Sequence, residues 1–244
     1  MKVIIRVDDV TPTDFMELSE WFRKYFPSIP VCCYVHKTNS RWTREAWRHV
    51  GKMIINYNWE IGGHTRNHPF LSSLTEEEIH DEISMNIKDI EIGLRDVGLE
   101  YKVTSFAYPF GDYDNRVKNV LKKLDVFFGL TYPDAYAYNS LLKIGDPYEV
   151  GISADSKIPL KILNNRFLRA IKESDIYCFC LHPQWYPYLD MNILWSDIRY
   201  FFPRSMLSVM RRTFNSEFSL DRIFSHIKFI EKFDKINFTT FKKV

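Results

Sequence analysis

The sequence predicts an α/β protein: a single-domain (β/α) barrel, distorted or seven-stranded, with parallel strands and an outer helix layer. Two observations lead to this prediction. Short apolar runs alternate with helical patterns six or seven times along the chain, with short links between them. The chain has 244 residues, which is within the range that one barrel fills, and 45% of them are hydrophobic, as in a globular protein.

The expected strands are short apolar runs that are bounded by polar or turn-forming residues. The first run meets two acidic residues, and a pair of glycines, Gly62 and Gly63, is expected to end the third. In chain order, the strands are expected at 3–7, 31–35, 59–61, 103–107, 126–130, 176–181 and 236–241.

The expected helices carry one apolar face each. The first places Phe15, Leu18, Phe22 and Tyr25 on that face. The longest has isoleucine, leucine and valine at steps of four and three. It begins with a capping box and ends before Gly98, a residue suited to a left-handed C-terminal turn. In chain order, the helices are expected at 14–26, 43–57 (capped by Thr43), 76–97 (capped by Thr75 and Glu78), 115–124, 160–172 and 220–233.

The composition points to the cytoplasm. No apolar run approaches the ~18 residues of a membrane span, and the N-terminal segment does not have the pattern of a signal peptide. The four cysteines, Cys32, Cys33, Cys178 and Cys180, lie in apolar runs without the spacing of a zinc knuckle. We therefore expect four reduced thiols in the core.

The C-terminal part of the chain is basic and aromatic. Residues 199–244 hold ten Lys or Arg, four Asp or Glu and ten Phe or Tyr. This stretch fits a peripheral contact with an anionic membrane or a phosphate-bearing substrate, but a C-terminal helix layer packed on the domain, with solvated charges outside, is the favoured interpretation. No nucleic-acid motif accompanies it, so nucleic acid is not an expected partner. We expect one domain over 1–244, with a motif-bearing barrel at 1–185 and a helical extension at 186–244.

Polar residues gather at the C-terminal ends of the predicted strands, which form the rim where parallel α/β folds build their sites. Two adjacent acids are costly to bury unless they are paired or bind a metal. Two histidines four residues apart share a face on a helical turn and can chelate a divalent ion. Neighbouring residues of a regular strand face opposite ways, so the first strand is expected to end at its acids. The clusters are Asp8-Asp9, His64 with His68, the loop Tyr108-Pro109-Phe110-Gly111-Asp112, and His182.

In this order the clusters resemble the motifs of the polysaccharide deacetylases, the NodB-homology or carbohydrate esterase family 4 proteins. The resemblance covers about residues 1–185 and includes Leu181 before His182. It implies one divalent metal ion, zinc before other divalent ions. The implied roles are metal ligand for Asp9, His64 and His68; general base for Asp8; general acid for His182; oxyanion donor for the backbone N–H of Phe110, in the loop with Tyr108, Pro109 and Gly111; and lining of the acyl pocket for Leu181.

The sequence departs from the family pattern at several positions. Ala107 stands where the family has an arginine that orients the base, and Arg6, two residues before Asp8, is a candidate to replace it. The family's fourth motif, which contains Asp and Trp, has no counterpart. Either Asp155 or Asp175 is expected to support His182.

The resemblance implies a metal-dependent hydrolase that removes an N-acyl group, above all acetyl, from an amino sugar or glycan precursor. Without an export signal, a cytoplasmic and lipid-linked precursor at the inner membrane face fits better than a cell-wall polymer. Two alternatives remain. One is a catalytically degenerate member of the fold that binds a glycan or a protein partner, and the other is a deformylase or O-esterase that acts on a lipid-linked sugar.

Overall fold

A parallel sheet forms the centre of the protein. The computed structural model describes residues 1–38, 42–132, 145–183 and 220–244. Within these residues the strand order is β5-β4-β3-β2-β1-β7-β6, all pairs are parallel, and β8 pairs with the start of β1. The strands are β1 (Lys2–Val10), β2 (Val31–Val35), β3 (Glu60–Gly63), β4 (Ser105–Ala107), β5 (Phe128–Leu130), β6 (Ala154–Asp155), β7 (Ile176–Leu181) and β8 (Asn237–Phe238).

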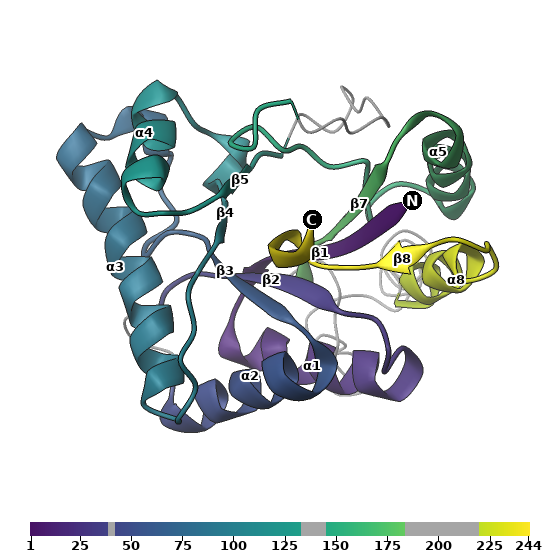
Figure 1. Cartoon of the computed structure of the whole chain (residues 1–244), viewed down its shortest axis with the longest axis horizontal. Coiled ribbons are helices and arrows are strands. Elements are labelled where there is room, and N and C mark those ends of the chain that lie inside the picture. The colour runs from purple at the N-terminus through teal and green to yellow at the C-terminus, as the bar shows by residue number, and fades with distance from the viewer. Residues whose placement is uncertain (39–41, 133–144, 184–219) are drawn as a thin grey trace, which may run out of the picture.

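The sheet curls into a distorted barrel, as the sequence predicted (Figure 1). The segment that leads into β6 links the two edges of the sheet. Its Val150 forms a parallel bridge to Leu130 of β5, and the N–H of Ser153 donates to the carbonyl of Cys178 on β7. Irregular chain, rather than a regular strand, therefore connects β5 to β7.

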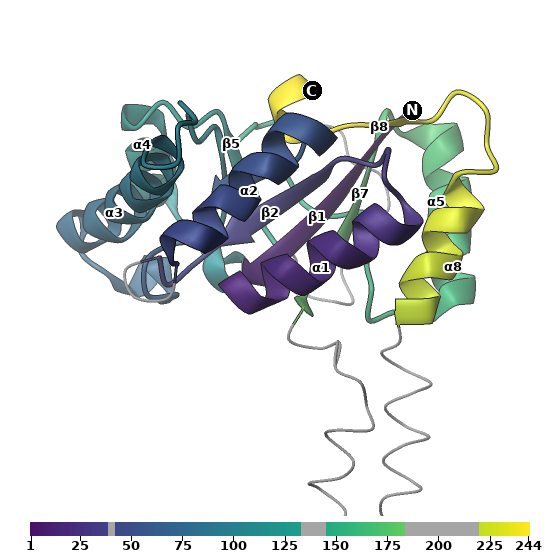
Figure 2. The ribbon, with the colours of Figure 1, turned by 90° about the horizontal axis from the view of Figure 1, so that it is seen from below.

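Helices cover the outer face of the sheet (Figure 2). The caps that the sequence indicated are present: Thr43 accepts the N–H of Ala46, and Thr75 and Glu78 form a capping box. Gly98 follows the longest helix with φ of 89°. The helices are α1 (Pro12–Tyr25), α2 (Arg44–Tyr57), α3 (Glu76–Arg95), α4 (Asn115–Lys123), α5 (Leu160–Glu173) and α8 (Leu220–Ile230).

Alternation along β1 separates two apolar clusters. Val3, Ile5 and Val7 pack in the large cluster between sheet and helices, whereas Ile4 belongs to a smaller cluster inside the barrel. Because successive side chains of a strand point to opposite faces, Arg6 and Asp8 follow Ile4 into the interior. The same rule applied to β7 directs His182 inward after Cys178 and Cys180 of the inner cluster.

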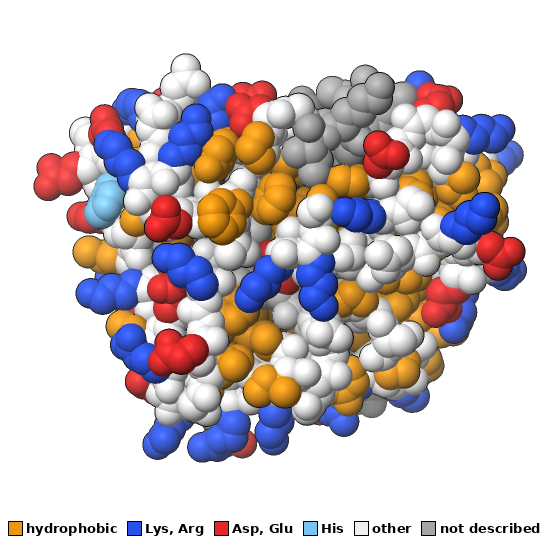
Figure 3. All heavy atoms as spheres, viewed as in Figure 1, with side chains coloured by type: hydrophobic (Ala, Val, Ile, Leu, Met, Phe, Trp, Pro, Cys, Tyr) orange, Lys and Arg blue, Asp and Glu red, His pale blue; other side chains and the backbone are white. Residues whose placement is uncertain are grey.

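The C-terminus closes one end of the barrel. A 3-10 helix, Phe241–Lys243, lies in the middle of the curled sheet in Figure 1, and Phe241 joins the inner cluster. The backbone N–H of Lys242 donates to the buried Glu60 at 2.7 Å. Figure 3 shows this face, on which both termini lie, with basic and acidic side chains interspersed. Residues 220–244 are thus part of the barrel fold, through α8, β8 and this 3-10 helix.

Three local expectations were wrong. The pair Gly62-Gly63 belongs to β3 instead of ending the strand. Glycine is needed inside this strand because a Cβ at Gly62 would overlap the ring of Tyr34 on the neighbouring strand β2. Tyr25 does not share the buried face of α1 and is 39% exposed. The last strand is only Asn237–Phe238, because the chain turns into the 3-10 helix that closes the barrel.

The cysteine prediction is confirmed. All four cysteines are free and fully buried, and burial raises the pKa of each thiol. Among the described helices, no helix has the length and apolar character to cross a membrane. Of the basic stretch 199–244, residues 199–219 lie outside the described part of the chain.

Candidate active site and metal centre

Asp8 and Asp9 reach the same end of the barrel through a bulge, not through the end of the strand that we expected. β1 continues to Val10, but its register with β2 shifts between Val7 and Val10. Asp9 takes a φ of 58°, which non-glycine residues rarely adopt. The bulge turns Asp9 away from strict alternation, so both carboxylates approach the histidines that follow the neighbouring strands.

Arg6 forms a bidentate ion pair with Asp8. Its Nε lies 2.8 Å from Asp8 Oδ1, and its Nη2 lies 2.6 Å from Asp8 Oδ2. The third contact is from Nη1 to the carbonyl of Thr131 at 2.9 Å. Burial disfavours the charged guanidinium, but Asp8 outweighs burial and raises the pKa of Arg6. Arg6 thus orients Asp8 in this chain, where Ala107 occupies the position of the family's arginine.

Asp9, His64 and His68 converge on one point. The Nε2 atoms of His64 and His68 each lie 2.8 Å from Asp9 Oδ1 and 3.2 Å from each other. Atoms bound 2.0–2.2 Å from one ion lie about 3 Å apart, so these donors fit a single divalent cation. His64 Nδ1 lies 2.7 Å from the carbonyl of Ala107, the second contact that metal-binding histidines usually make. Two imidazoles and one carboxylate suit zinc and similar ions.

The two histidines lie on a loop after β3, not on the helical turn that their spacing suggested. Thr65 and His68 have φ of 61° and 62°, so the segment is not helical. Glu82 of α3 fixes this loop, because its carboxylate accepts hydrogen bonds from the backbone N–H groups of Arg66 and Asn67. The left-handed backbone at Thr65 and His68 thus brings both imidazoles to Asp9 without a helical turn.

The charges of this cluster support one another. Burial opposes ionisation of Asp9, but hydrogen bonds from His64 and then His68 outweigh it and lower the pKa of Asp9 below its ordinary range. Burial likewise opposes the charged form of His64, but the hydrogen bond and charge of Asp9 outweigh burial and raise the pKa of His64. A cation placed between these donors would replace the hydrogen bonds that join the two imidazoles to Asp9.

His36 is a third histidine at this place that the sequence reasoning missed. It follows β2, and its ring centroid lies 5.4 Å from that of His68 and 6.1 Å from that of His64. Burial, and then the charge of His64, lower its pKa to about 3. Its position one residue after a predicted strand was the signal, the same one that drew attention to Asp8 and His182.

Of the two candidate acids, Asp155 and not Asp175 lies next to the imidazole of His182. Nδ1 of His182 lies 3.5 Å from Oδ2 of the fully buried Asp155. The hydroxyl of Tyr132 donates to the same oxygen at 2.7 Å, and the Tyr132 ring meets the imidazole edge to face. The backbone carbonyl of Asp175, at the other end of β7, accepts from Lys2. His182 therefore has an acidic partner at its Nδ1 atom. Because Val7 of β1 pairs with Leu181 of β7, the next residues, Asp8 and His182, are also neighbours.

The loop after β4 places the ring of Phe110, and not that of Tyr108, beside the candidate metal ligands. The ring of Tyr108 is buried, and its hydroxyl donates to the carbonyl of Tyr148. Pro109, Phe110 and Gly111 form a 3-10 turn in which Phe110 has φ of 58°. The exposed ring of Phe110 lies 4.6 Å from that of His68 and stacks on Phe70 at 4.1 Å. Phe110 is thus next to the candidate metal ligands.

Leu181 does not lie with the other candidate site residues. It is buried in the large cluster between sheet and helices, on the opposite face of β7 from Cys180. The contact of Leu181 with an acyl group, expected from the resemblance, therefore has no counterpart in the described residues.

The family model of the polysaccharide deacetylases matches residues 2–128, just over half of the chain. The chain therefore belongs to the polysaccharide deacetylase family, as its motifs indicated. The match includes Asp8, Asp9, His64 and His68 and ends before His182. A search of the curated proteins found no match.

Solved structures show the same fold at low identity. A carbohydrate esterase family 4 pseudoenzyme from Bacillus anthracis has 16% identity and a TM-score of 0.55, over 96% of this chain and 62% of its own. A mutant of that protein with restored enzymatic activity has 20% identity and a TM-score of 0.50, over 75% and 56%. A proposed polysaccharide deacetylase from Mycobacterium smegmatis has 12% identity and a TM-score of 0.59, over 99% and 87%. This chain spans 56–66% of the length of the Bacillus structures.

Proposed function

We propose that this protein is a divalent-metal-dependent hydrolase that removes an N-acyl group, above all acetyl, from an amino sugar or glycan precursor. One observation carries the proposal: three donor atoms suited to one cation lie beside an acid–base pair at one end of the barrel. The family membership supports it. Asp9, His64 and His68 would hold the ion, which supplies a Lewis acid for the amide carbonyl and lowers the pKa of water.

The residues around the donor group suit the remaining steps. Asp8, whose position Arg6 fixes, takes the proton from the attacking water. The backbone N–H of Phe110, next to the candidate metal ligands, would stabilise the developing oxyanion. His182, supported by Asp155 on the far side of its ring, gives a proton to the amine, which leaves poorly without one. Because both Asp8 and His182 are present, the site has a base and an acid, which mere binding does not need.

Metal content tests the first half of this proposal. We expect one zinc-like ion per chain in the purified protein, and loss of the ion in Asp9→Ala and His68→Ala. His80→Ala is the matched control, because His80 is half exposed on α3 and pairs with Asp81 away from the site. An equal metal content in Asp9→Ala and the unmodified protein would contradict the ligand assignment.

Acyl release tests the second half. We expect the metal-loaded protein to release acetate from N-acetylated amino sugars, and Asp8→Asn and His182→Gln each to reduce the rate by about 10²–10⁴-fold. Parallel assays with N-formyl and O-acetyl substrates decide the bond. Faster release of formate, or of acetate from the ester, would favour a deformylase or an O-esterase.

A catalytically degenerate, glycan- or partner-binding protein is the second candidate. The absence of the family's arginine at Ala107 favours it, and one solved structure of this fold is described as a pseudoenzyme. Against it, Arg6 supplies the missing countercharge to Asp8 from two residues earlier on the same strand, β1. Glycan binding with no acyl release by the metal-loaded protein would support this candidate.

Location and membrane contact also remain proposals. We propose a cytoplasmic protein that contacts the inner face of the membrane through residues 199–244, whose basic and aromatic composition supports such a contact. Co-sedimentation with anionic vesicles at low and high salt tests it. Binding that is absent at both salt concentrations would contradict the proposal.

A further inference from the structure

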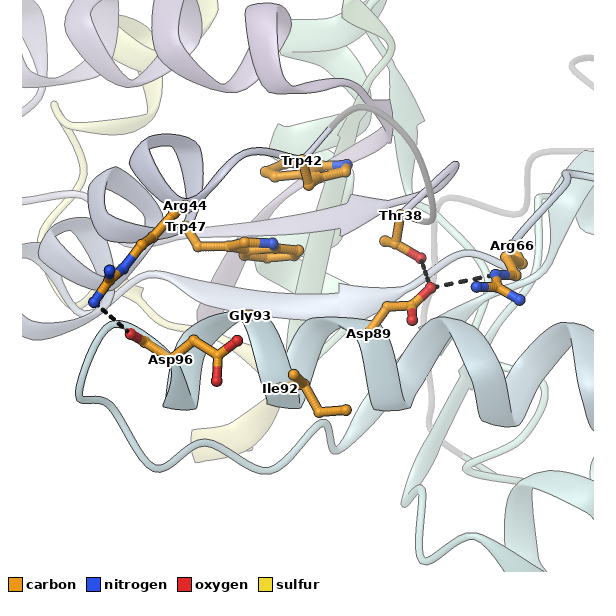
Figure 4. Close-up of a pocket in the computed structure, with 9 residues that line it drawn as sticks. All are labelled: Thr38, Trp42, Arg44, Trp47, Arg66, Asp89, Ile92, Gly93 and Asp96. Carbon is orange, nitrogen blue, oxygen red and sulfur yellow. Dashed lines mark hydrogen bonds and ion pairs between the residues drawn. The ribbon is translucent and has the colours of Figure 1, made fainter.

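A pocket that none of the candidate metal ligands lines lies next to the loop that carries His64 and His68. It has a volume of about 590 Å³ and is bounded by α3, the start of α2 and the loops after β2 and β3 (Figure 4). Asp89 on α3 and Asp96, the C-cap residue of α3, lie two turns apart, which separates them by about 10 Å along the helix axis. Figure 4 shows these two carboxylates at opposite ends, with two indole rings on the other side.

The aromatic wall is held rigidly. Trp42 stacks on Trp47 with ring centroids 4.6 Å apart and planes 24° apart. Trp47 in turn lies directly on the backbone of α3, because a Cβ at Gly93 would overlap its indole. Trp42 donates from Nε1 to the carbonyl of His36 at 3.3 Å. The two stacked indoles therefore form one apolar side of the pocket.

The pocket is lined by as many positively as negatively charged side chains, which offer both hydrogen-bond donors and acceptors. Arg44 and Arg66 face Asp89 and Asp96, so the four charges balance. Asp89 accepts from Thr38 at 2.8 Å and lies 3.3 Å from Nε of Arg66. Balanced charge gives no reason to prefer an anion or a cation. Mixed donors and acceptors beside an aromatic face suit hydroxyl groups on an apolar ring.

The pocket and the candidate metal centre share two loops. Arg66 lies between His64 and His68 on the loop after β3, and Thr38 lies two residues after His36 on the loop after β2. The fully buried Asn86 joins them: it accepts the N–H of His64 at 2.9 Å and approaches Thr38 Oγ1 at 3.3 Å. A ligand in the pocket would thus contact the segments that position the metal ligands.

We propose that this pocket, walled by Trp42 and Trp47 and flanked by Arg66 and Asp89, binds a neutral sugar unit. The sugar is part of a glycan that extends from the acyl-bearing residue at the metal centre. This assignment to the substrate rests on the proposed function, whereas the binding of a sugar to the pocket does not. The consequence is a preference for oligosaccharides over single amino sugars.

Titration of tryptophan fluorescence tests the pocket without requiring hydrolysis. The full chain is titrated with neutral trisaccharides that carry no acyl group (maltotriose and cellotriose) and with triacetylchitotriose. We expect saturable binding of at least one, weakened about tenfold in Trp42→Ala because an aromatic contact is lost. Trp42→Phe is expected to retain most of the affinity, since the ring face remains.

Two further variants separate the pocket from the metal centre. Trp21→Phe is the matched control, because Trp21 packs on Phe22 and Phe26 of the α1 region, away from the pocket. Asp9→Ala lacks a proposed metal ligand and is expected to bind maltotriose and cellotriose, which carry no acyl group, as the unmodified protein does. No saturable binding of any of the three sugars, or equal affinity in Trp42→Ala, would overturn the proposal. Sugar binding without acyl release would instead contradict the proposed function and leave the pocket standing.

Discussion

Arg6 and Asp8 form the interaction whose removal should be most informative. Both side chains are buried, and two charge-assisted hydrogen bonds of 2.8 and 2.6 Å join them. Arg6→Met keeps the length of the side chain and removes the charge. Asp8 is then left as an uncompensated carboxylate inside the barrel. Breaking a buried pair in this way costs about 3–5 kcal/mol, and we expect the free energy of unfolding to fall by that amount.

The double variant Arg6→Met with Asp8→Asn distinguishes a lost ion pair from lost packing. It removes both charges, so the desolvation penalty that remains in each single variant disappears. We expect the double variant to be more stable than Arg6→Met alone, with a coupling energy of about 2–3 kcal/mol.

Urea denaturation at pH 7, followed by circular dichroism, measures these differences. Arg169→Met is the control, because the exposed pair of Arg169 with Glu173 on α5 should contribute only about 0.3–0.5 kcal/mol. A loss below ~1 kcal/mol in Arg6→Met, or a double variant no more stable than the single one, would refute the reasoning.

Three other substitutions follow from particular contacts. Gly93→Ala should lower stability although alanine favours helices by about 1 kcal/mol, because its Cβ overlaps Trp47; a more stable variant in the same denaturation assay would contradict this packing. His226 is buried, and burial lowers its pKa to about 3. The unfolded chain therefore takes up a proton near pH 6.5 that the folded chain does not, and stability falls by roughly 1.4 kcal/mol per unit as the pH drops below 6.5. His226→Gln should show a smaller slope from pH 6.5 to 4, and an unchanged slope would assign the effect to other groups. Asn86→Leu leaves the buried N–H of His64 unpaired, so stability should fall by about 1–3 kcal/mol and zinc affinity by about 10–100-fold; calorimetric zinc titration with unchanged affinity would show that Asn86 does not position the loop.

Local signals predicted most of the elements. The apolar run at 31–35 and the run at 176–181 are β2 and β7 with the expected bounds, and α3 begins at its capping box. These features depend on residues close together in the chain. The prediction that glycines 62 and 63 end the strand was wrong because these glycines make room for Tyr34 and Phe106 on neighbouring strands. The local sequence does not reveal that packing.

The candidate site shows the same division. Residue type and position after a strand singled out Asp8, Asp9, His64, His68 and His182, because parallel strands carry their sites at one rim. The spacing of the two histidines predicted a helical turn, and this was wrong, since Glu82 of α3 holds the loop in another conformation. His36 was missed although it directly follows a predicted strand, because it belongs to none of the motifs that the resemblance singled out.

By itself the sequence determined the class of fold, the family and the candidate site residues, because periodicity and motif order are local or linear properties. Only the tertiary structure decided how these residues are supported. It selected Asp155 over Asp175 for His182, gave Asp8 its partner in Arg6, and turned Leu181 toward the helices. The choice of Asp155 depends on a neighbouring strand distant in sequence, whereas the pairing of Arg6 with Asp8 and the direction of Leu181 depend on which face of each strand points inward. Folding alone fixes those relations.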